Sequence, residues 1–124
     1  MGTSTNANVI YGIALEGLGD VDIHADTEDL PEDHPARMYA CAEPFDGICI
    51  DAHCSDSCPM YIIGLDDTRV CALRGSPELL DEGYREVTPE EPQKLLDYCA
   101  KWGFVIDEKV GLGKPRWLVY SWWS

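Results

Sequence analysis

The sequence predicts an α+β domain in which a mainly antiparallel sheet carries one main helix, at about residues 88–103, on one of its faces. Segments typical of strands follow one another in the first half of the chain and return at the C-terminus, whereas the helical patterns come late. Strands in runs, without alternating helices, are typical of this fold class. A chain of 124 residues with 45% hydrophobic residues can bury one modest core, so residues 1–124 are expected to form a single domain.

Seven segments rich in β-branched, aromatic and other apolar residues are predicted to be strands. Asp66 and Asp67 predict a turn that joins residues 60–65 and 68–73 as a hairpin. The C-terminal segment is apolar on both faces, which indicates either a central strand or a partner surface; the second interpretation predicts a homodimer through this strand. The seven segments are residues 7–15, 36–42, 47–53, 60–65, 68–73, 104–106 and 116–123.

The main helix is predicted from a start signal, an apolar periodicity and a stop signal. Thr88-Pro-Glu-Glu91 has the spacing of a capping box, and Gly103 is a residue that commonly ends a helix. A shorter helix is expected to begin at Ser76 and Pro77. Apolar residues at i, i+3, i+4 and i+7 form the buried face of the main helix: Leu95, Tyr98, Cys99 and Trp102.

The charge of the chain is strongly negative and unevenly distributed. The net charge is −14: residues 1–67 hold fourteen acids and one base, whereas residues 68–124 hold nine acids and eight bases. Such a surface repels nucleic acid and anionic membranes, so neither is an expected partner. It attracts a basic protein surface and makes association fast and salt-sensitive. The alternative is that the acids only keep the protein soluble.

Most of the unbalanced charge lies in residues 16–35, which are expected to form a long acidic loop with one helical turn at residues 26–30. Loops of this length in a compact domain are usually functional or mobile. Because no Lys or Arg lies among them, its acids are the predicted partner-binding residues: Glu16, Asp20, Asp22, Asp26, Glu28, Asp29, Glu32 and Asp33.

The stretch DAHCSDSC, residues 51–58, brings together residue types that bind metals or act as nucleophiles. His53, Cys54 and Cys58 could contribute to a zinc site, but the second ligand pair that structural zinc sites usually have is missing. His53 and Cys54 are neighbours on a strand and point to opposite faces, so they cannot form a nucleophile–base pair. A turn through residues 55–57 is favoured, and no catalytic residue or cofactor is predicted.

Basic residues in the second half of the chain give an alternative site for a small anionic ligand. Gly111-Leu-Gly-Lys114 lacks the spacing of a phosphate-binding loop. Arg69, Arg74, Lys114 and Arg116 could still converge with aromatic residues to hold an anion. The competing interpretation is that these bases pair with acids of the same chain.

Several short pieces of the sequence form a recognisable set: residues 3–7 running into Tyr11-Gly-Ile13, His53-Cys-Ser55 with Cys58-Pro-Met-Tyr-Ile62, and Arg74-Gly75 with the helix that follows. Together they resemble a group of small uncharacterised proteins of tailed bacteriophages. The resemblance implies a context, a protein made in an infected bacterium, and it implies no activity and no catalytic residues. No apolar run approaches the ~20 residues of a membrane span, and the N-terminus lacks a secretory signal, so a cytoplasmic location is expected.

Together these observations predict a non-enzymatic phage-type inhibitor that binds a basic surface of a host or defence protein by partial charge mimicry of DNA. A CRISPR effector or another nucleic-acid-binding enzyme is the kind of target expected. The alternative from another class is a small-molecule binder that sequesters a nucleotide-like immune signal. A minor component of the virion is a third hypothesis.

Overall fold

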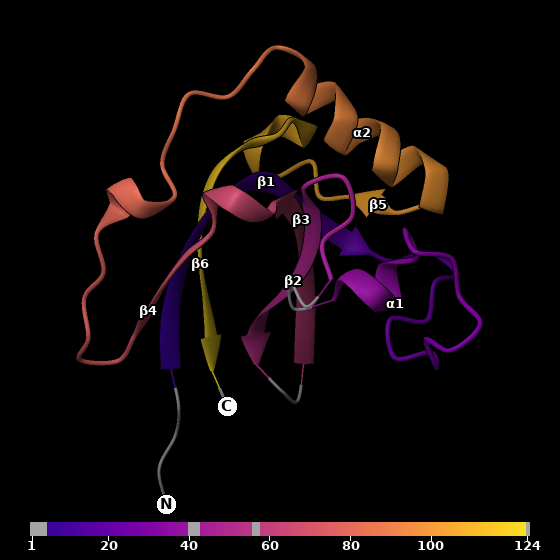
Figure 1. Cartoon of the computed structure of the whole chain (residues 1–124), viewed down its shortest axis with the longest axis horizontal. Coiled ribbons are helices and arrows are strands. Elements are labelled where there is room, and N and C mark those ends of the chain that lie inside the picture. Colours follow the sequence, from indigo (N-terminus) through magenta and orange to yellow (C-terminus); the bar gives the residue numbers. More distant parts are fainter. Residues whose placement is uncertain (1–4, 40–42, 56–57, 124) are drawn as a thin grey trace, which may run out of the picture.

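The fold is an α+β arrangement dominated by one bent sheet, as the sequence predicts at this coarse level. It is seen in a computed structural model that describes residues 5–39, 43–55 and 58–123 (Figure 1). In the described residues the sheet has six strands, and a single long helix, α2 (Glu90–Trp102), lies across it. The strands are β1 (Thr5–Gly17), β2 (Ile48–Ser55), β3 (Cys58–Leu65), β4 (Val70–Leu73), β5 (Val105–Ile106) and β6 (Arg116–Trp123).

Strand β1 organises the sheet because it pairs with four other strands. Its first half lies between β6 and β4, and its second half pairs with β3 and β5. Figure 1 shows β1 rising beside β6 and then turning across the top of the sheet. All pairings of β1 are antiparallel, but β2 and β6 pair in parallel at Cys54 and Trp122. The sheet is therefore not purely antiparallel.

Two glycines allow β1 and β3 to cross closely. A Cβ atom on Gly12 would lie 2.2 Å from the carbonyl oxygen of Ile63. A Cβ atom on Gly64 would lie 2.5 Å from Cδ1 of Ile10. Neither space admits a side chain, so the contact that lets the sheet curl back on β1 depends on glycine at both positions.

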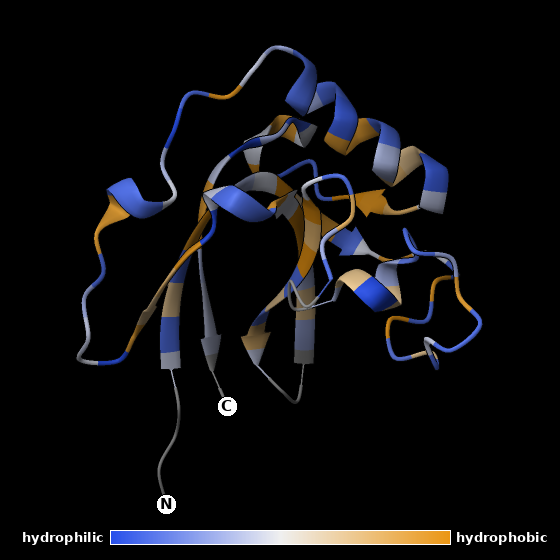
Figure 2. Cartoon of the chain, viewed as in Figure 1, coloured by the Kyte–Doolittle hydropathy of each residue, from blue (hydrophilic) through white to orange (hydrophobic). Residues whose placement is uncertain are grey.

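The core has two parts, one on each face of the bent sheet. The larger part joins α2 to the strands through Leu95, Tyr98 and Cys99, which confirms the helical face expected from the sequence. The smaller part contains Ile10, Cys49, Ile62 and Tyr120. In Figure 2 the strands beneath α2 are mostly hydrophobic, whereas α2 itself alternates between hydrophilic and hydrophobic residues.

The ends of α2 follow the predicted signals. The Glu91 carboxylate accepts hydrogen bonds from the backbone N–H of Thr88 at 2.9 Å and from its hydroxyl at 3.0 Å, which is the glutamate half of a capping box. At the other end Gly103 has a φ of 69°, and the N–H of Phe104 donates to the carbonyl of Cys99. This left-handed glycine ends the helix in the usual way.

The predicted hairpin between residues 60–65 and 68–73 is wrong, because β4 pairs with β1 and not with β3. The link between β3 and β4 is a 3₁₀ turn, η1 (Asp66–Thr68). The Thr68 hydroxyl donates to the carbonyl of Leu65 at 2.7 Å and accepts from the backbone N–H of Tyr11 at 3.0 Å. This tie to β1 directs the chain onto the edge of β1.

Three shorter predictions are also corrected. The strand predicted at residues 36–42 is replaced at its start by a short helix, α1 (Pro35–Met38). Pro35 favours the first turn of this helix, and the His34 ring caps it by accepting a hydrogen bond from the Ala36 N–H at 3.0 Å. In the rest of that predicted strand, Tyr39 forms only an isolated parallel bridge with Ile50, and residues 40–42 lie outside the described residues. Residues 26–30 form a turn and not a helical turn. The helix expected at Ser76 is absent, and a 3₁₀ turn follows at η2 (Leu80–Glu82).

Strand β6 lies inside the sheet, between β1 and β2, which fits the first interpretation of its two apolar faces. Its side chain at Val119 is nevertheless 79% exposed. The homodimer through this strand remains a prediction. Among the helices of the described residues, none has the length and apolar character needed to cross a bilayer.

Candidate functional site

The acidic segment, defined here as residues 16–35, leaves the end of β1 and leads into α1. Residues 18–34 contain neither helix nor strand, as expected for a loop. The segment is nevertheless anchored to the body of the protein. Ile23 is buried in the larger core, and the hydroxyl of Tyr98 on α2 donates to the backbone carbonyl of Asp33 at 3.0 Å. The segment is therefore held by packing at Ile23 and by a hydrogen bond from a buried donor at Asp33.

Arg37 on α1 holds the middle of the segment. Its guanidinium donates to the carbonyl of Leu30 at 3.3 Å and to that of Thr27 at 3.5 Å, and it pairs with Glu43 at 3.3 Å. It is the only base among residues 1–67. Its isolation among so many acids is the one sequence signal that could have identified it as an anchor.

Two of the acids fix local turns within the segment. The Asp22 carboxylate accepts the N–H of His24 at 3.0 Å, and the Asp26 carboxylate accepts the N–H of Glu28 at 3.1 Å. These are Asx turns, in which a short acidic side chain replaces a backbone carbonyl as acceptor. The backbone that carries the charges is thus ordered by its own side chains as well as by the anchors.

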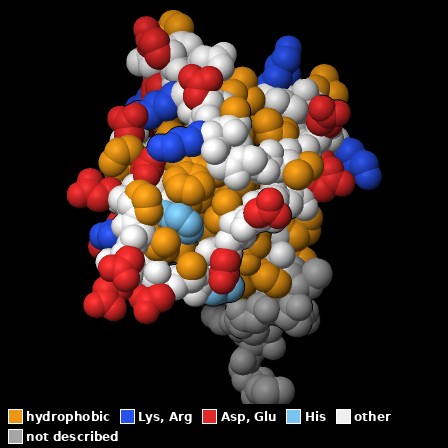
Figure 3. Space-filling view, turned by 90° about the vertical axis from the view of Figure 1, so that its right-hand side faces the viewer, with side chains coloured by type: hydrophobic (Ala, Val, Ile, Leu, Met, Phe, Trp, Pro, Cys, Tyr) orange, Lys and Arg blue, Asp and Glu red, His pale blue; other side chains and the backbone are white. Residues whose placement is uncertain are grey.

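Seven of the eight predicted partner-binding acids are exposed and have no ion pair within the described residues: Glu16, Asp20, Asp22, Asp26, Glu28, Asp29 and Glu32. The exception is Asp33, which is half-buried and pairs with Lys101 of α2. Figure 3 shows many acidic side chains on the side of the molecule that it presents, most of them around the edge, with hydrophobic side chains between them. The structure therefore displays these seven carboxylates to solvent on an anchored backbone.

The four basic residues of the alternative anion site do not converge. Leu73 pairs with Asn6, and Arg116 pairs with Gly12, so Arg74 and Arg116 lie six β1 residues apart, which is roughly 20 Å along a strand. Lys114 precedes β6, near Arg116, and Arg69 lies elsewhere, beside Asp51.

Arg69 belongs to a buried polar cluster that sequence reasoning missed. The Asp51 carboxylate accepts from Arg69 Nε at 3.0 Å, from the Tyr120 hydroxyl at 2.6 Å and from the N–H of Ala52 at 3.0 Å. Arg69 also donates to Asn8 Oδ1 at 3.4 Å. Burial, and then the nearby Asp51 charge, raise the pKa of Tyr120 above its ordinary value. The hydroxyl therefore stays protonated and donates to the carboxylate.

Asn8, Asp51 and Arg69 of this cluster line a cavity of about 260 Å³, whose lining also includes Tyr39 and Trp122. The charges of Asp51 and Arg69 offset one another, so the cavity is polar without being strongly cationic. Volume alone places it slightly below the range of typical small-molecule sites. The arrangement suits an uncharged polar group better than a phosphate.

The zinc candidates are only partly described. His53 is half-buried beside Tyr120, and burial lowers its pKa because the charged form is disfavoured. Its Nε2 has no hydrogen-bond partner in the described part of the chain. Cys54 is exposed, with a φ of 78°, and the side chain of Cys58 lies outside the description. Within the residues that are described, no three His, Cys, Asp or Glu side chains gather as a metal site would require.

Comparison of the chain with protein-family models, with curated proteins and with solved structures finds no match.

Proposed function

We propose that this protein is a non-enzymatic inhibitor that binds a basic surface of another protein through the acidic segment, by partial charge mimicry of DNA. The observation that carries the proposal is the set of seven exposed carboxylates on an anchored backbone, none of which has an ion pair among the described residues. The target class is a nucleic-acid-binding protein of a bacterial host or of its defence machinery, such as a CRISPR effector.

The distribution of ion pairs supports this choice over simple solubility. Five of the nine bases are already paired with acids within the described residues: Arg37, Arg69, Arg85, Lys94 and Lys101. Among the acids of the segment, only Asp33 is neutralised by one of these bases within the described residues. The negative charge of the others therefore acts on the surrounding solvent and on an approaching partner. A concentrated field of one sign steers a basic partner and raises its association rate.

Anchoring of the segment also favours binding. Residues that are already held by Ile23, Arg37 and Tyr98 lose less conformational freedom when a partner docks than a free chain would. The carboxylates can then act as a preorganised set, as the phosphates of a duplex do.

The test is a capture experiment from bacterial lysate with three forms of the protein. The segment variant carries Asn or Gln at five exposed acids: Asp22, Asp26, Glu28, Asp29 and Glu32. Asn keeps the acceptor oxygen that each Asx turn requires. The control variant loses the same number of charges at exposed acids elsewhere that have no ion pair within residues 5–39, 43–55 and 58–123: Glu78, Asp81, Glu82, Glu86 and Glu108.

Wild type and control are expected to capture the same nucleic-acid-binding protein at low salt and release it at high salt. The segment variant should capture at least about tenfold less, because several charges of the interface are lost together. Equal capture by the segment variant and the control would contradict the proposal.

A second candidate function is sequestration of a small nucleotide-like molecule, whose uncharged base, and not its phosphate, would enter the cavity beside Asp51 and Arg69. Trp122 and Tyr39 line it and could stack on a base, while Asn6 and Asn8 supply amide groups. Native mass spectrometry after exposure to cyclic nucleotides tests this alternative. A bound mass that disappears in Arg69→Ala would support it, and an unchanged apo mass would count against it.

A further inference from the structure

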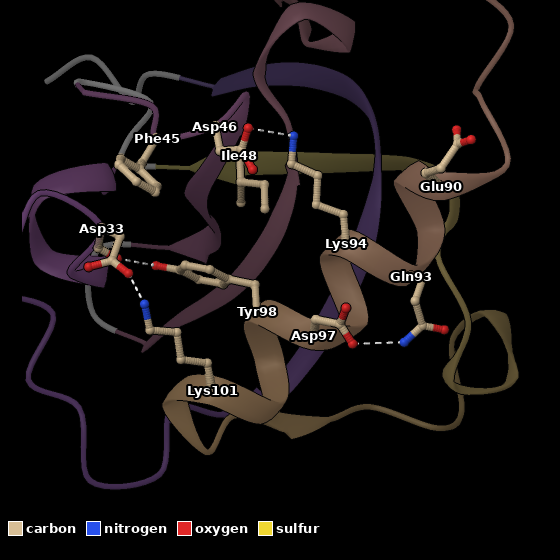
Figure 4. A pocket seen from close by; sticks show the side chains of 10 residues that line it. All are labelled: Asp33, Phe45, Asp46, Ile48, Glu90, Gln93, Lys94, Asp97, Tyr98 and Lys101. Carbon is tan, nitrogen blue, oxygen red and sulfur yellow. Dashed lines mark hydrogen bonds and ion pairs between the residues drawn. The ribbon is translucent and has the colours of Figure 1, made fainter.

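A groove runs along the exposed side of α2, next to the end of the acidic segment (Figure 4). One wall is a single face of the helix, from Glu90 to Lys101. The other wall contains Asp33, at the end of the acidic segment, and residues 45–48, which lead into β2. Its volume is about 540 Å³, within the range of sites that bury a ligand or a side chain.

The floor of the groove is apolar. Ile48 and Tyr98 are only 3% and 7% exposed, whereas the Phe45 side chain at the opening is 39% exposed. In Figure 4 the side chains of Phe45, Ile48 and Tyr98 lie near one another in the groove. An apolar side chain that entered here would remove the Phe45 ring from water.

The rim is charged, and its charges do not balance. Lys94 Nζ lies 3.2 Å from Asp46 Oδ1, and Lys101 pairs with Asp33, so both lysines are neutralised by the opposite wall. Asp97 accepts a hydrogen bond from the Gln93 amide at 2.8 Å and, like Glu90, has no ion pair within the described residues. The rim thus carries four carboxylates against two ammonium groups, a net charge of −2.

We infer that this groove binds a short extended segment of the basic partner, with one large apolar side chain between Phe45 and Tyr98 and with Lys or Arg residues on either side. The inference rests on the proposed function and specifies what the partner must present. Charge complementarity selects a basic segment, because Glu90 and Asp97 are the rim charges that have no counter-ion in the part of the chain that the structure describes. Continuity supports it, because Asp33 belongs to both the acidic segment and the groove.

The length of the groove fits a peptide. Glu90 and Lys101 are eleven residues apart on α2, which corresponds to roughly 16 Å along a helix. An extended chain covers this distance in about five residues. A central apolar residue with two basic residues on each side therefore places its charges near both ends of the rim.

The test uses two blocked pentapeptides, one with Trp between two pairs of Arg and one with Ser in place of Trp. Each is titrated into isotope-labelled protein and followed by backbone amide shifts. The Trp peptide is expected to bind at least about fivefold more tightly than the Ser peptide, since only it buries an apolar ring. Its shifts should centre on Phe45, Ile48 and the middle of α2.

Variants distinguish the groove from general charge attraction. Phe45→Ala should reduce the affinity for the Trp peptide to that for the Ser peptide. Val105→Ala, which changes an exposed apolar residue on β5, should leave both affinities unchanged. Glu90→Lys and Asp97→Lys, both at exposed positions, should lower the affinity of the protein for both peptides at least about threefold without disturbing the core.

Equal affinity for the two peptides, or amide shifts confined to residues 16–32, would overturn the groove as a peptide site. Either result would leave the proposed function standing, because the lysate capture depends on the five-site segment variant and not on Phe45. Conversely, if the segment variant and the control captured the same amount of partner, the proposed function would be refuted even if the Trp peptide bound in the groove.

Discussion

Glu91 ties the first turn of α2 to the long connection that follows β4. Both of its carboxylate oxygens accept from Arg85, at 2.7 and 2.9 Å, and Arg85 also forms two bonds to Asp67, at 2.7 and 3.1 Å. Hydrogen bonds from Arg85, and then those from Thr88, lower the pKa of Glu91 from 4.5 to about 2, against the opposing effect of desolvation. Glu91→Gln removes the charge and keeps an acceptor for Thr88.

The shift in pKa sets an upper bound on the cost of this substitution. At 1.36 kcal/mol per pKa unit, the lowering of Glu91 corresponds to about 3 kcal/mol of stability. The Glu91 side chain is 16% exposed and that of Arg85 is 35% exposed, so solvent screens part of the attraction. We therefore expect Glu91→Gln to cost about 1–2 kcal/mol near neutral pH, or about 4–8 °C in Tm.

The pH dependence has a definite sign. Because the folded-state pKa of Glu91 is depressed, its contribution is complete above the unfolded pKa of about 4.5 and is lost as the pH falls toward 2. Urea unfolding followed by tryptophan fluorescence at neutral pH and near pH 2.5 measures this. Glu90→Gln is the matched control, because the neighbouring Glu90 has no ion pair in the described residues. The reasoning is refuted if Glu91→Gln costs the same at both pH values, or no more than Glu90→Gln at neutral pH.

Three further predictions concern the sheet, a buried histidine and the acidic segment. Gly64→Ala should lower the free energy of unfolding by about 1–3 kcal/mol, because its Cβ would collide with Ile10 of β1. Gly17→Ala should change it little, because a Cβ there meets nothing within 4 Å, and urea unfolding measures both variants. NMR titration of His53 should give a midpoint below 6.5, because burial lowers its pKa. Its protonation in the unfolded chain should then destabilise the fold as the pH falls through the unfolded-state pKa of 6.5. A midpoint at or above 6.5 would contradict the burial of His53. Arg37→Ala should speed hydrogen exchange of the Leu30 amide severalfold, and no change relative to Arg74→Ala would show that Arg37 is not the anchor.

The elements that could be predicted from sequence are those set by local patterns. The buried face of α2 is specified by apolar spacing and its ends by Thr88, Glu91 and Gly103, so its course was foreseeable. The pairing of β4 was not, because it depends on the contact between Thr68 and Tyr11, fifty-seven positions apart. Local turn signals at Asp66 and Asp67 were correct, but they do not determine which strand receives the chain.

The candidate site divides in the same way. Exposure of the acids follows from their density and from the lack of bases, and sequence is sufficient to predict it. The anchors formed by Ile23 and Tyr98 depend on long-range packing and could not be predicted. Convergence of the basic residues required Arg74 and Arg116 to lie close together, and the register of β1 with β4 and β6 separates them.

The groove beside α2 was missed for a related reason. Its helix wall can be read from the periodicity of α2, but Phe45 and Asp33 come from two separate loops. A half-exposed Phe in the turn before β2 has no sequence signature. Only the folded chain brings it opposite Tyr98.

Displacement of DNA from the captured partner tests the central claim most directly. A fluorescently labelled duplex bound to that partner is titrated with wild-type protein, with the five-site segment variant and with the charge-matched control, and anisotropy reports release of the duplex. The account predicts that wild type and control release the duplex as they saturate the partner, whereas the segment variant requires at least about tenfold more protein. A stable complex of partner, duplex and wild-type protein would contradict charge mimicry.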